Sequence, residues 1–466
     1  MDPQSEHPPG PHDPPAASLR HDPRPSSTLL ARARHRAPAA AVRLLRARPR
    51  LAALALIVVA VIVGTGLGFV ARPPDDPALA LASPTTGPSG DSGPTTGPTP
   101  TRGSTATPGA TVHVEASATP IPATTAAPAS APPTPKASGA PLPPRTAASY
   151  LLLAPAEIKR LPASGAAWQW VKEVAGRSAT PKLSAQDSEA DIVVFARALV
   201  FVRTGDKAMR TSVVKALKAV VGTEKGGRTL ALGRNLPGFV LAADLIDLRS
   251  ADPAFDKKVF RPWLRSLFTK VLDGATLVST AEDRPNNWGT HAGAARVALA
   301  RYLGDTKQLA RQAKVFRGWL GDRSAYAGFT YGDLSWQCDP AKPVGINPVG
   351  CTRDGHSLDG VQPDDQRRGG DYTWPPPKEN YAWEALQGAV LQAELLSQAG
   401  HAAWSWEDKA LLRAVTWLVE EANYPAAGDD RWQPWLIDAR YRTSFHGSVA
   451  ENLGKNFAFT EWLYAP

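Results

Sequence analysis

The chain has 466 residues, a formal net charge of +9 and 45 prolines. Nine arginines and four acidic residues lie within the first 50 positions, so more than half of the net positive charge belongs to one short tail. The charge therefore does not indicate nucleic-acid binding, and we expect no nucleic-acid partner. All 14 tryptophans lie beyond residue 150, which places the material for a hydrophobic core in the C-terminal part.

Three segments precede that core. Residues 1–50 are rich in Pro and Arg and predict a basic, disordered cytoplasmic tail. Residues 51–71 contain no charged side chain and are long enough to cross a bilayer as one transmembrane helix. Residues 72–147 are dominated by Pro, Thr, Ser and Ala, and we expect an extended linker because such a segment cannot bury enough apolar surface to fold.

The arginines just before the apolar run predict its orientation. Positive residues favour the cytoplasmic side of a membrane, so residues 148–466 are expected outside the cell. We therefore predict an uncleaved signal-anchor in the cell membrane, with a single pass and a cytoplasmic N-terminus. Cleavage near the Ala-Leu-Ala sequence at 78–82 is the alternative.

Beyond residue 155, apolar residues recur at helical spacing. The predicted helices form pairs, at 191–204 and 207–221, 236–248 and 256–272, 294–303 and 307–320, and 381–399 and 406–424. Glycine at three of the breaks supplies a left-handed helix cap. The spacing indicates a repeat of about 50 residues, with one break hidden in a long loop. We predict an all-α domain over residues 148–466, an incomplete (α/α) toroid of about five or six helical hairpins, with an open solenoid as the alternative.

The most informative motif is Asp-Arg-Pro-Asn-Asn-Trp-Gly-Thr-His at 283–291. Asn286 and Asn287 stand where an apolar helix is expected to begin, and His291 follows one turn later. Residues four apart share a helix face, so Asn287 and His291 can point at one ligand. An amide donor beside a titratable base suits proton removal next to a carboxylate. Helix capping explains one of the two asparagines equally well.

The segment 321–378 is too long to be a passive connector. It interleaves aromatic, basic and acidic residues: Tyr326, Tyr331, Trp336, His356, Asp359, Asp364, Asp365, Arg367, Arg368, Tyr372 and Trp374. Aromatic rings stack on sugars and arginine binds carboxylates through paired hydrogen bonds, so we expect a sugar-binding rim. A disulfide-tied lid with a solvated surface is the alternative.

The two cysteines of the chain, Cys338 and Cys351, lie close together in the sequence. We expect a disulfide between them, because oxidation is permitted on the exported side of a membrane; two free thiols are the alternative. No metal-ligand spacing accompanies them, and we expect neither a metal nor a cofactor.

Two ordered blocks resemble the alginate lyase family, whose members fold as α/α toroids. The first block is Asn286-Asn287 leading into an Ala-rich helix. The second begins with Asp-Gly-Val-Gln-Pro at 359–363, runs to Arg367-Arg368, and resumes with Asn-Tyr-Ala at 380–382. The resemblance covers roughly residues 155–465. The chain departs from the family pattern at Trp288, where the family has His, and at Lys378, where it has Tyr.

The resemblance implies β-elimination at a uronic acid of an acidic, alginate-like polysaccharide. Neutralising the sugar carboxylate stabilises an enolate-like intermediate, a role that falls to Asn287 and Arg367. His291 is the candidate base, and Tyr372, before Tyr381, is the candidate phenolic acid or base. Further substrate-binding residues are expected at Asn286, Trp288, Tyr331, Trp336, Arg368, Trp374 and Asn380.

Two other readings of the residues stay open. A glycoside hydrolase on the same fold would need two carboxylates across a cleft, and the candidates are Asp283, Asp359, Asp365 and Glu384. The Asn and Arg pairs are not needed for hydrolysis, so we rank this reading lower. A non-catalytic glycan-binding surface protein is the third reading, because one fold hosts many functions.

Overall fold

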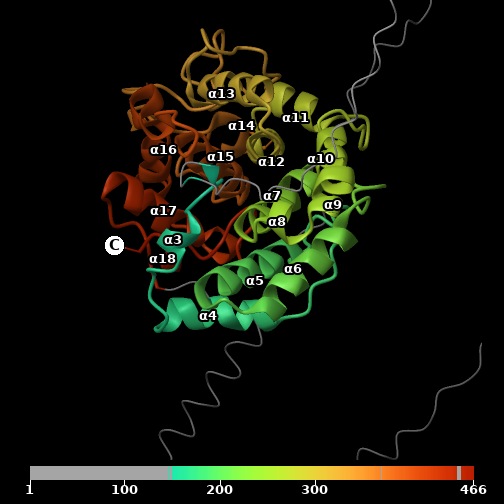
Figure 1. Ribbon diagram of the computed structural model, residues 1–466. Helices are drawn as coiled ribbons and strands as arrows, with labels where there is room; N and C mark the ends of the chain where they lie inside the picture. The colour runs from blue at the N-terminus through green and yellow to red at the C-terminus, as the bar shows by residue number, and fades with distance from the viewer. Residues whose placement is uncertain (1–145, 147–148, 369, 449–452, 466) are drawn as a thin grey trace, which may run out of the picture. The chain divides into compact units, whose positions relative to one another are not determined.

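The computed structural model describes residue 146 and residues 149–368, 370–448 and 453–465, all of which belong to one unit of the chain, 128–466 (Figure 1). The predicted tail 1–50, the predicted transmembrane helix 51–71 and nearly all of the predicted linker 72–147 lie outside these residues. Within the described ranges, no helix combines the length and the apolar character needed to cross a membrane. The transmembrane helix at 51–71 therefore stays a prediction from sequence.

The described residues are mostly helical. The longer helices are α4 (Ala166–Gly176), α5 (Ala190–Thr204), α6 (Lys207–Val220), α7 (Thr229–Leu245), α10 (Arg261–Leu267), α11 (Leu277–Asp283), α12 (Asn287–Leu303), α13 (Thr306–Leu320), α15 (Tyr381–Ser397), α16 (Trp406–Thr416) and α17 (Trp432–Tyr441). The short ones are α3 (Pro155–Ile158), α8 (Leu248–Ala251), α9 (Pro253–Phe255), α14 (Pro363–Gln366) and α18 (Thr460–Leu463). Single turns of π-helix or 3₁₀-helix are η2 (Asp256–Phe260), η3 (Ala403–Ser405), η4 (Trp417–Glu421) and η5 (Gly428–Asp430). The prediction of an all-α domain is confirmed for the described residues, where β1 (Thr352–Arg353) and β2 (His356–Ser357) form one small antiparallel pair.

Three helices of 17 residues each, α7, α12 and α15, form the interior. Helix α12 packs against both of the others (Figure 1). A Cβ at Gly233 of α7 would lie 2.9 Å from the backbone nitrogen of Ala292, and one at Gly388 of α15 would lie 2.4 Å from the carbonyl carbon of Thr290. Glycine therefore permits the close approach of both helices to the first turns of α12.

The Gly-Asp breaks between paired helices are confirmed. Gly205 and Gly304 have φ values of 79° and 70° at the ends of α5 and α12. The aspartate after each glycine caps the next helix, since Asp206 accepts the backbone N–H groups of Ala208 and Met209 and Asp305 accepts that of Gln308. Each two-residue break thus ends one helix and starts the next.

Other helix boundaries differ from the prediction. The helix expected at 236–248 is α7, which begins at Thr229, seven residues earlier. Pro237 does not start this helix but lies inside it, and the added first turns bury two polar side chains, Arg234 and Asn235. Proline lacks an N–H, so the carbonyl of Gly233 has no helical donor at position 237. Helices α4, α11 and α17 were not predicted.

The long segment between α13 and α15 is built around the predicted disulfide, which is confirmed. The Cα atoms of Cys338 and Cys351 lie 5.7 Å apart. We call residues 335–361, which contain this bridge and the β1–β2 pair, the disulfide loop. Trp336 is fully buried inside it, where its ring contacts those of Tyr372 and Trp417.

Candidate active site

Asn286 and Asn287 at the start of α12 do different things. Asn286 is the N-cap, and its side chain accepts the backbone N–H of Trp288 at 3.2 Å. The side chain of Asn287 is therefore free of capping, although it is only 1% exposed. Its Nδ2 donates to Glu384 Oε2 at 2.8 Å, and its Oδ1 accepts from Arg368 Nη2. Asn287 thus bridges a carboxylate and a guanidinium.

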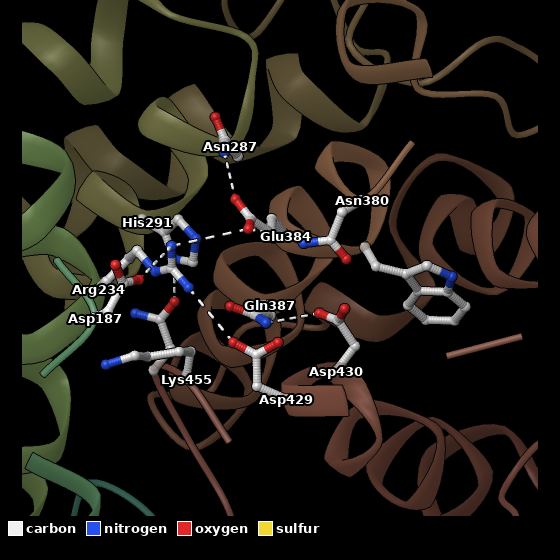
Figure 2. A network of polar contacts seen from close by, with 12 residues as sticks. Asp187, Arg234, Asn287, His291, Asn380, Glu384, Gln387, Asp429, Asp430 and Lys455 are labelled. Atoms are coloured by element: carbon white, nitrogen blue, oxygen red, sulfur yellow. Dashed lines mark hydrogen bonds and ion pairs between the residues drawn. The ribbon is translucent and has the colours of Figure 1, made fainter. Parts of the chain in front are cut away.

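Glu384 lies in the first turn of α15 and brings a second helix start to the same place (Figure 2). Its Oε1 accepts from Asn380 Nδ2 at 2.8 Å and lies 3.8 Å from Arg234 Nη1. Asn380 is exposed, whereas Glu384 is buried, so the group runs from the solvent into the interior. We call these four residues the helix-start cluster: Asn287, Arg368, Asn380 and Glu384.

Arg368 is fixed from several sides. Its Nη2 also contacts Asp365 Oδ1 at 3.2 Å, and its guanidinium carbon lies 3.9 Å from the ring centroid of Tyr381. Asp365 accepts the backbone N–H of Asn287. Burial raises the pKa of Asp365 to about 8, although the positive charge of Arg368 opposes this. At neutral pH the carboxyl of Asp365 is thus mainly protonated.

Arg234 on α7 is a cation beneath the helix-start cluster. Its side chain is 1% exposed and faces three carboxylates, at 3.5 Å from Asp429, 3.8 Å from Glu384 and 4.0 Å from Asp187. Its Nε is buried without a hydrogen-bond partner among the described residues. All three ion-pair distances are long, so this guanidinium is held by charge more than by short hydrogen bonds.

Asp430 is a buried carboxyl beside this cation (Figure 2). Its Oδ1 accepts from Gln387 Nε2 at 2.6 Å and from Gln433 Nε2 at 3.0 Å. Burial, then the neighbouring charges of Asp429 and Glu384, raises the pKa of Asp430 well above its usual range. The environment of Asp430 therefore favours the protonated form of this carboxyl.

His291, one turn after Asn287, is fully buried. Its Nδ1 contacts Asn456 Oδ1, and its Nε2 has no partner within the described part of the chain. Burial and then the charge of Arg234 lower the pKa of His291 well below its ordinary value. The ring is neutral at physiological pH, and it offers an unprotonated nitrogen.

Comparison with known proteins identifies one stretch of the chain. Residues 150–331 match the family model described as alginate lyase. The resemblance to the alginate lyase family is confirmed over this range. No curated protein and no solved structure matches the chain.

The match to the alginate lyase family indicates a polysaccharide lyase and an acidic polysaccharide substrate. The matched range includes Arg234, Asn287 and His291 but ends before Arg368 and Glu384. The family match therefore covers only part of the candidate site, and the other part comes from geometry alone.

The structure brings some of the sequence-predicted residues together. Asn287, Arg368, Asn380 and Tyr381 lie at the two helix starts. His291 lies deeper on the same helix as Asn287, close enough to Arg234 for the two to interact electrostatically.

Other predicted catalytic residues lie apart from this cluster. Arg367 Nη1 donates to Thr373 Oγ1 at 3.2 Å, so Arg368 is the arginine that contacts Asn287. The phenol of Tyr372 donates to the carbonyl of Arg353 at 3.4 Å, and its ring lies against Trp336. Both assignments came from sequence order, which does not show where a loop side chain points.

The aromatic rings predicted to stack on sugars are largely buried or packed against other side chains of the protein. Trp336 is fully buried, so its ring is not accessible to a sugar in this structure, and its sugar-binding role stays a prediction from sequence. Tyr331 is mostly buried, which raises the pKa of its phenol. Trp374 stacks on His356 with centroids 3.8 Å apart.

At the start of α12, the guanidinium of Arg284 lies over the ring of Trp288, 4.5 Å from the ring centroid. Asn286 serves as the helix cap, as the simpler reading of the sequence allowed.

The four carboxylates considered for a glycoside hydrolase also fall into two groups, according to whether they contact Asn287. Asp365 and Glu384 both bind Asn287, the first through its backbone and the second through its side chain. Asp283 accepts from Thr330, and Asp359 binds Arg413, so neither contacts the helix-start cluster directly.

Several residues of the site were missed by sequence reasoning. They are Arg234, Gln387, Asp429, Asp430, Lys455 and Asn456. Arg234 interrupts an otherwise apolar helix, and Asp429-Asp430 is an acidic pair, so both are visible in the sequence. Nothing local places them beside Asn287, because they lie about 50 and 140 positions away in the chain. Among the described residues, no group of three or more His, Cys, Asp or Glu side chains could hold a metal ion.

Proposed function

We propose that this chain is a polysaccharide lyase that cleaves a uronic-acid-containing polymer by β-elimination. One observation carries the proposal: Asn287 is held between Arg368 and Glu384 where two interior helices begin. The match of residues 150–331 to the alginate lyase family supports the same reaction class. We also propose that the helical hairpins form an incomplete (α/α) toroid, as in that family.

The reaction needs three functions, and the site offers a group for each. Arg368 and Asn287 would neutralise the sugar carboxylate, which makes the C5 proton removable. His291 Nε2 would accept that proton, and Tyr381 would protonate the leaving glycosidic oxygen. The C4–O bond breaks as the C4–C5 double bond forms, so no water is consumed.

His291 is fully buried, so a substrate can reach it only if neighbouring side chains move. Arg234 is the obvious candidate, since its three ion pairs are all 3.5 Å or longer. Catalytic contacts often tighten only when substrate is bound, so burial alone does not exclude His291. Tyr381 is partly exposed and needs no such change.

The first test is a comparison of Asn287→Ala with Asn347→Ala in the full-length chain. Asn347 is a matched control: it is also buried, and its amide donates to Trp336 O at 2.9 Å and accepts from Cys338 N at 3.1 Å, inside the disulfide loop. Turnover of uronic-acid polysaccharides would be followed by ultraviolet absorbance of the unsaturated product and by reducing ends.

We expect Asn287→Ala to lower kcat by about 10²–10³, the usual cost of one oxyanion donor. Asn347→Ala should destabilise the fold but leave the turnover of the folded protein within about threefold of wild type. Undiminished turnover in Asn287→Ala, or an equal loss in both variants, would reject the assignment.

A glycoside hydrolase is the second candidate, favoured by one observation. Asp365 and Glu384 both bind Asn287, and the raised pKa of Asp365, about 8, keeps one carboxyl protonated, as a general acid must be. The same assay separates the two reactions, because hydrolysis gives reducing ends without the absorbance. Neither signal, together with measurable polymer binding, would indicate a glycan-binding protein.

We further propose that residues 51–71 anchor the protein in the membrane with the helical domain outside the cell. The Cys338–Cys351 disulfide supports an oxidising compartment. Protease added to intact cells should remove the helical domain, and protection from protease would contradict this location.

A further inference from the structure

A chain of four groups leads from a proline in α7 to the imidazole of His291. Pro237 has no N–H, so the carbonyl of Gly233 lacks the donor that an α-helix normally supplies four residues later. Asn456 Nδ2 donates to this carbonyl at 2.9 Å. The Asn456 amide thereby takes the place of the missing helical N–H.

The orientation of the Asn456 amide follows from this contact. A backbone carbonyl can only accept, so the NH₂ end of the amide faces Gly233 and the oxygen end faces His291. An oxygen can only accept as well, so Nδ1 of His291 must carry the proton. Nε2 is left with its lone pair and without a partner among the described side chains.

The backbone of Asn456 is shaped for this position. Its φ is +64°, in the left-handed region that asparagine tolerates better than most residues. The side chain is fully buried between α7 and α12. The charged groups that act on His291 are Arg234 from α7 and Lys455 from the neighbouring residue, and both disfavour a second positive charge there.

We propose that Asn456 is a positioning residue that holds His291 in the Nδ1-protonated form and so presents Nε2 as the proton acceptor of the site. The proposal rests on the proposed function for the role of His291, but the protonation pattern itself can be measured without substrate. Histidine tautomers are set in general by the hydrogen bond that the other ring nitrogen makes.

The experiment uses the full-length chain labelled with ¹⁵N-histidine, with the His291 signals assigned by their loss in His291→Gln. Asn456→Gly deletes the amide while glycine retains the left-handed backbone without strain. Pro237→Ala leaves Asn456 in place but restores an N–H that competes for the Gly233 carbonyl. Thr460→Val is the control, since Thr460 is buried in the same C-terminal segment but donates to the carbonyl of Trp432.

In wild type we expect the ¹⁵N shifts of a neutral ring protonated at Nδ1. Asn456→Gly should move His291 toward the Nε2-protonated form and lower kcat by about 10–100-fold with little change in KM, since a base in the wrong tautomer cannot accept the proton. Pro237→Ala should shift the signals in the same direction by less, and Thr460→Val should not shift them.

An Nε2-protonated ring in wild type, or unchanged His291 signals in Asn456→Gly, would overturn the proposal. A tautomer change with unaltered kcat would also overturn it, because Asn456 would then be merely structural. Absence of lyase activity in wild type, with the expected tautomer present, would instead reject the proposed function and leave the protonation pattern intact.

Discussion

The helix-start cluster and the disulfide loop are both rich in polar and aromatic residues, but they use them differently. In the cluster, side chains bind one another, as Asn287 does with Arg368 and Glu384. In the loop, side chains bind the backbone: Gln337 forms two hydrogen bonds with the main chain of Val344, each 2.9 Å long. The loop amides therefore replace the secondary structure that the segment lacks.

The difference shows how to tell a structural polar group from a functional candidate. A buried side chain that binds backbone groups is explained once those groups are satisfied. Arg234 Nε and His291 Nε2 have no partner in the described part of the chain, although both are buried, and the same holds for Trp336 Nε1 in the loop. The two site atoms differ from the indole nitrogen in lying beside Asn287 and Glu384, where charged and titratable groups meet. An unpartnered atom in that setting needs an explanation, and a substrate is one.

Replacing the loop tryptophan tests the structural half of this comparison and should have a large effect at any pH. Trp336→Ala should lower the free energy of unfolding by about 3–5 kcal/mol, because it leaves a large cavity in a fully buried site. Trp374→Ala should lower it by less than about 1 kcal/mol, because that ring is partly exposed and mainly stacks on His356. Chemical denaturation of both variants checks this.

Similar losses from the two tryptophans would mean that the loop has no distinct core. Loss of polymer binding without loss of stability in Trp336→Ala would support the sugar-binding role expected from sequence.

Replacing Arg367 and Arg368 in turn tests the functional half of this comparison, the helix-start cluster. Arg368→Gln should lower kcat/KM by about 10²–10³, or about 2.7–4 kcal/mol, because it removes the charge that contacts Asn287. Arg367→Gln should lower it by less than about tenfold, since Arg367 contacts Thr373. Product absorbance measures both, and unfolding curves control for stability. A larger loss at Arg367 would favour the assignment made from sequence.

The helical part of the fold could be predicted because its signals are local. A Gly-Asp pair at 205–206 or 304–305 contains both a left-handed cap and an N-cap, so the break needs no information from elsewhere. The start of α7 could not be predicted, because Pro237 suggests a helix boundary. Its helical conformation depends instead on packing against α5 and α12 and on an amide more than 200 residues away.

The candidate site was predicted where it lies on helix starts and missed where it depends on distant contacts. Asn287 and His291 share a face because they are four residues apart, which the sequence shows directly. The choice between Arg367 and Arg368 depends on which way one loop residue turns, and periodicity does not apply there. Asp430 and Asn456 join the site only through tertiary packing.

A pH experiment on Asp365 tests the helix-start cluster at the level of a single proton, the one on the carboxyl beside Asn287. The folded pKa of about 8 lies above the value of about 3.9 in the unfolded chain, so the folded state binds this proton more tightly. Its contribution to stability is fully present below about pH 4 and is lost as the pH rises through about 8. Asp365→Asn has no such proton, so its stability relative to wild type should increase over that window.

The change is at most about 1.4 kcal/mol for each pH unit, and it should level off above the folded pKa. Denaturation curves at pH 5, 6, 7 and 9 measure it, with Asp371→Asn, an exposed carboxylate nearby, as the control for the charge change. A difference that stays constant with pH would mean that Arg368 keeps Asp365 ionised. The carboxyl would then be one half of an ion pair at Asn287, and the hydrolase reading would lose its general acid.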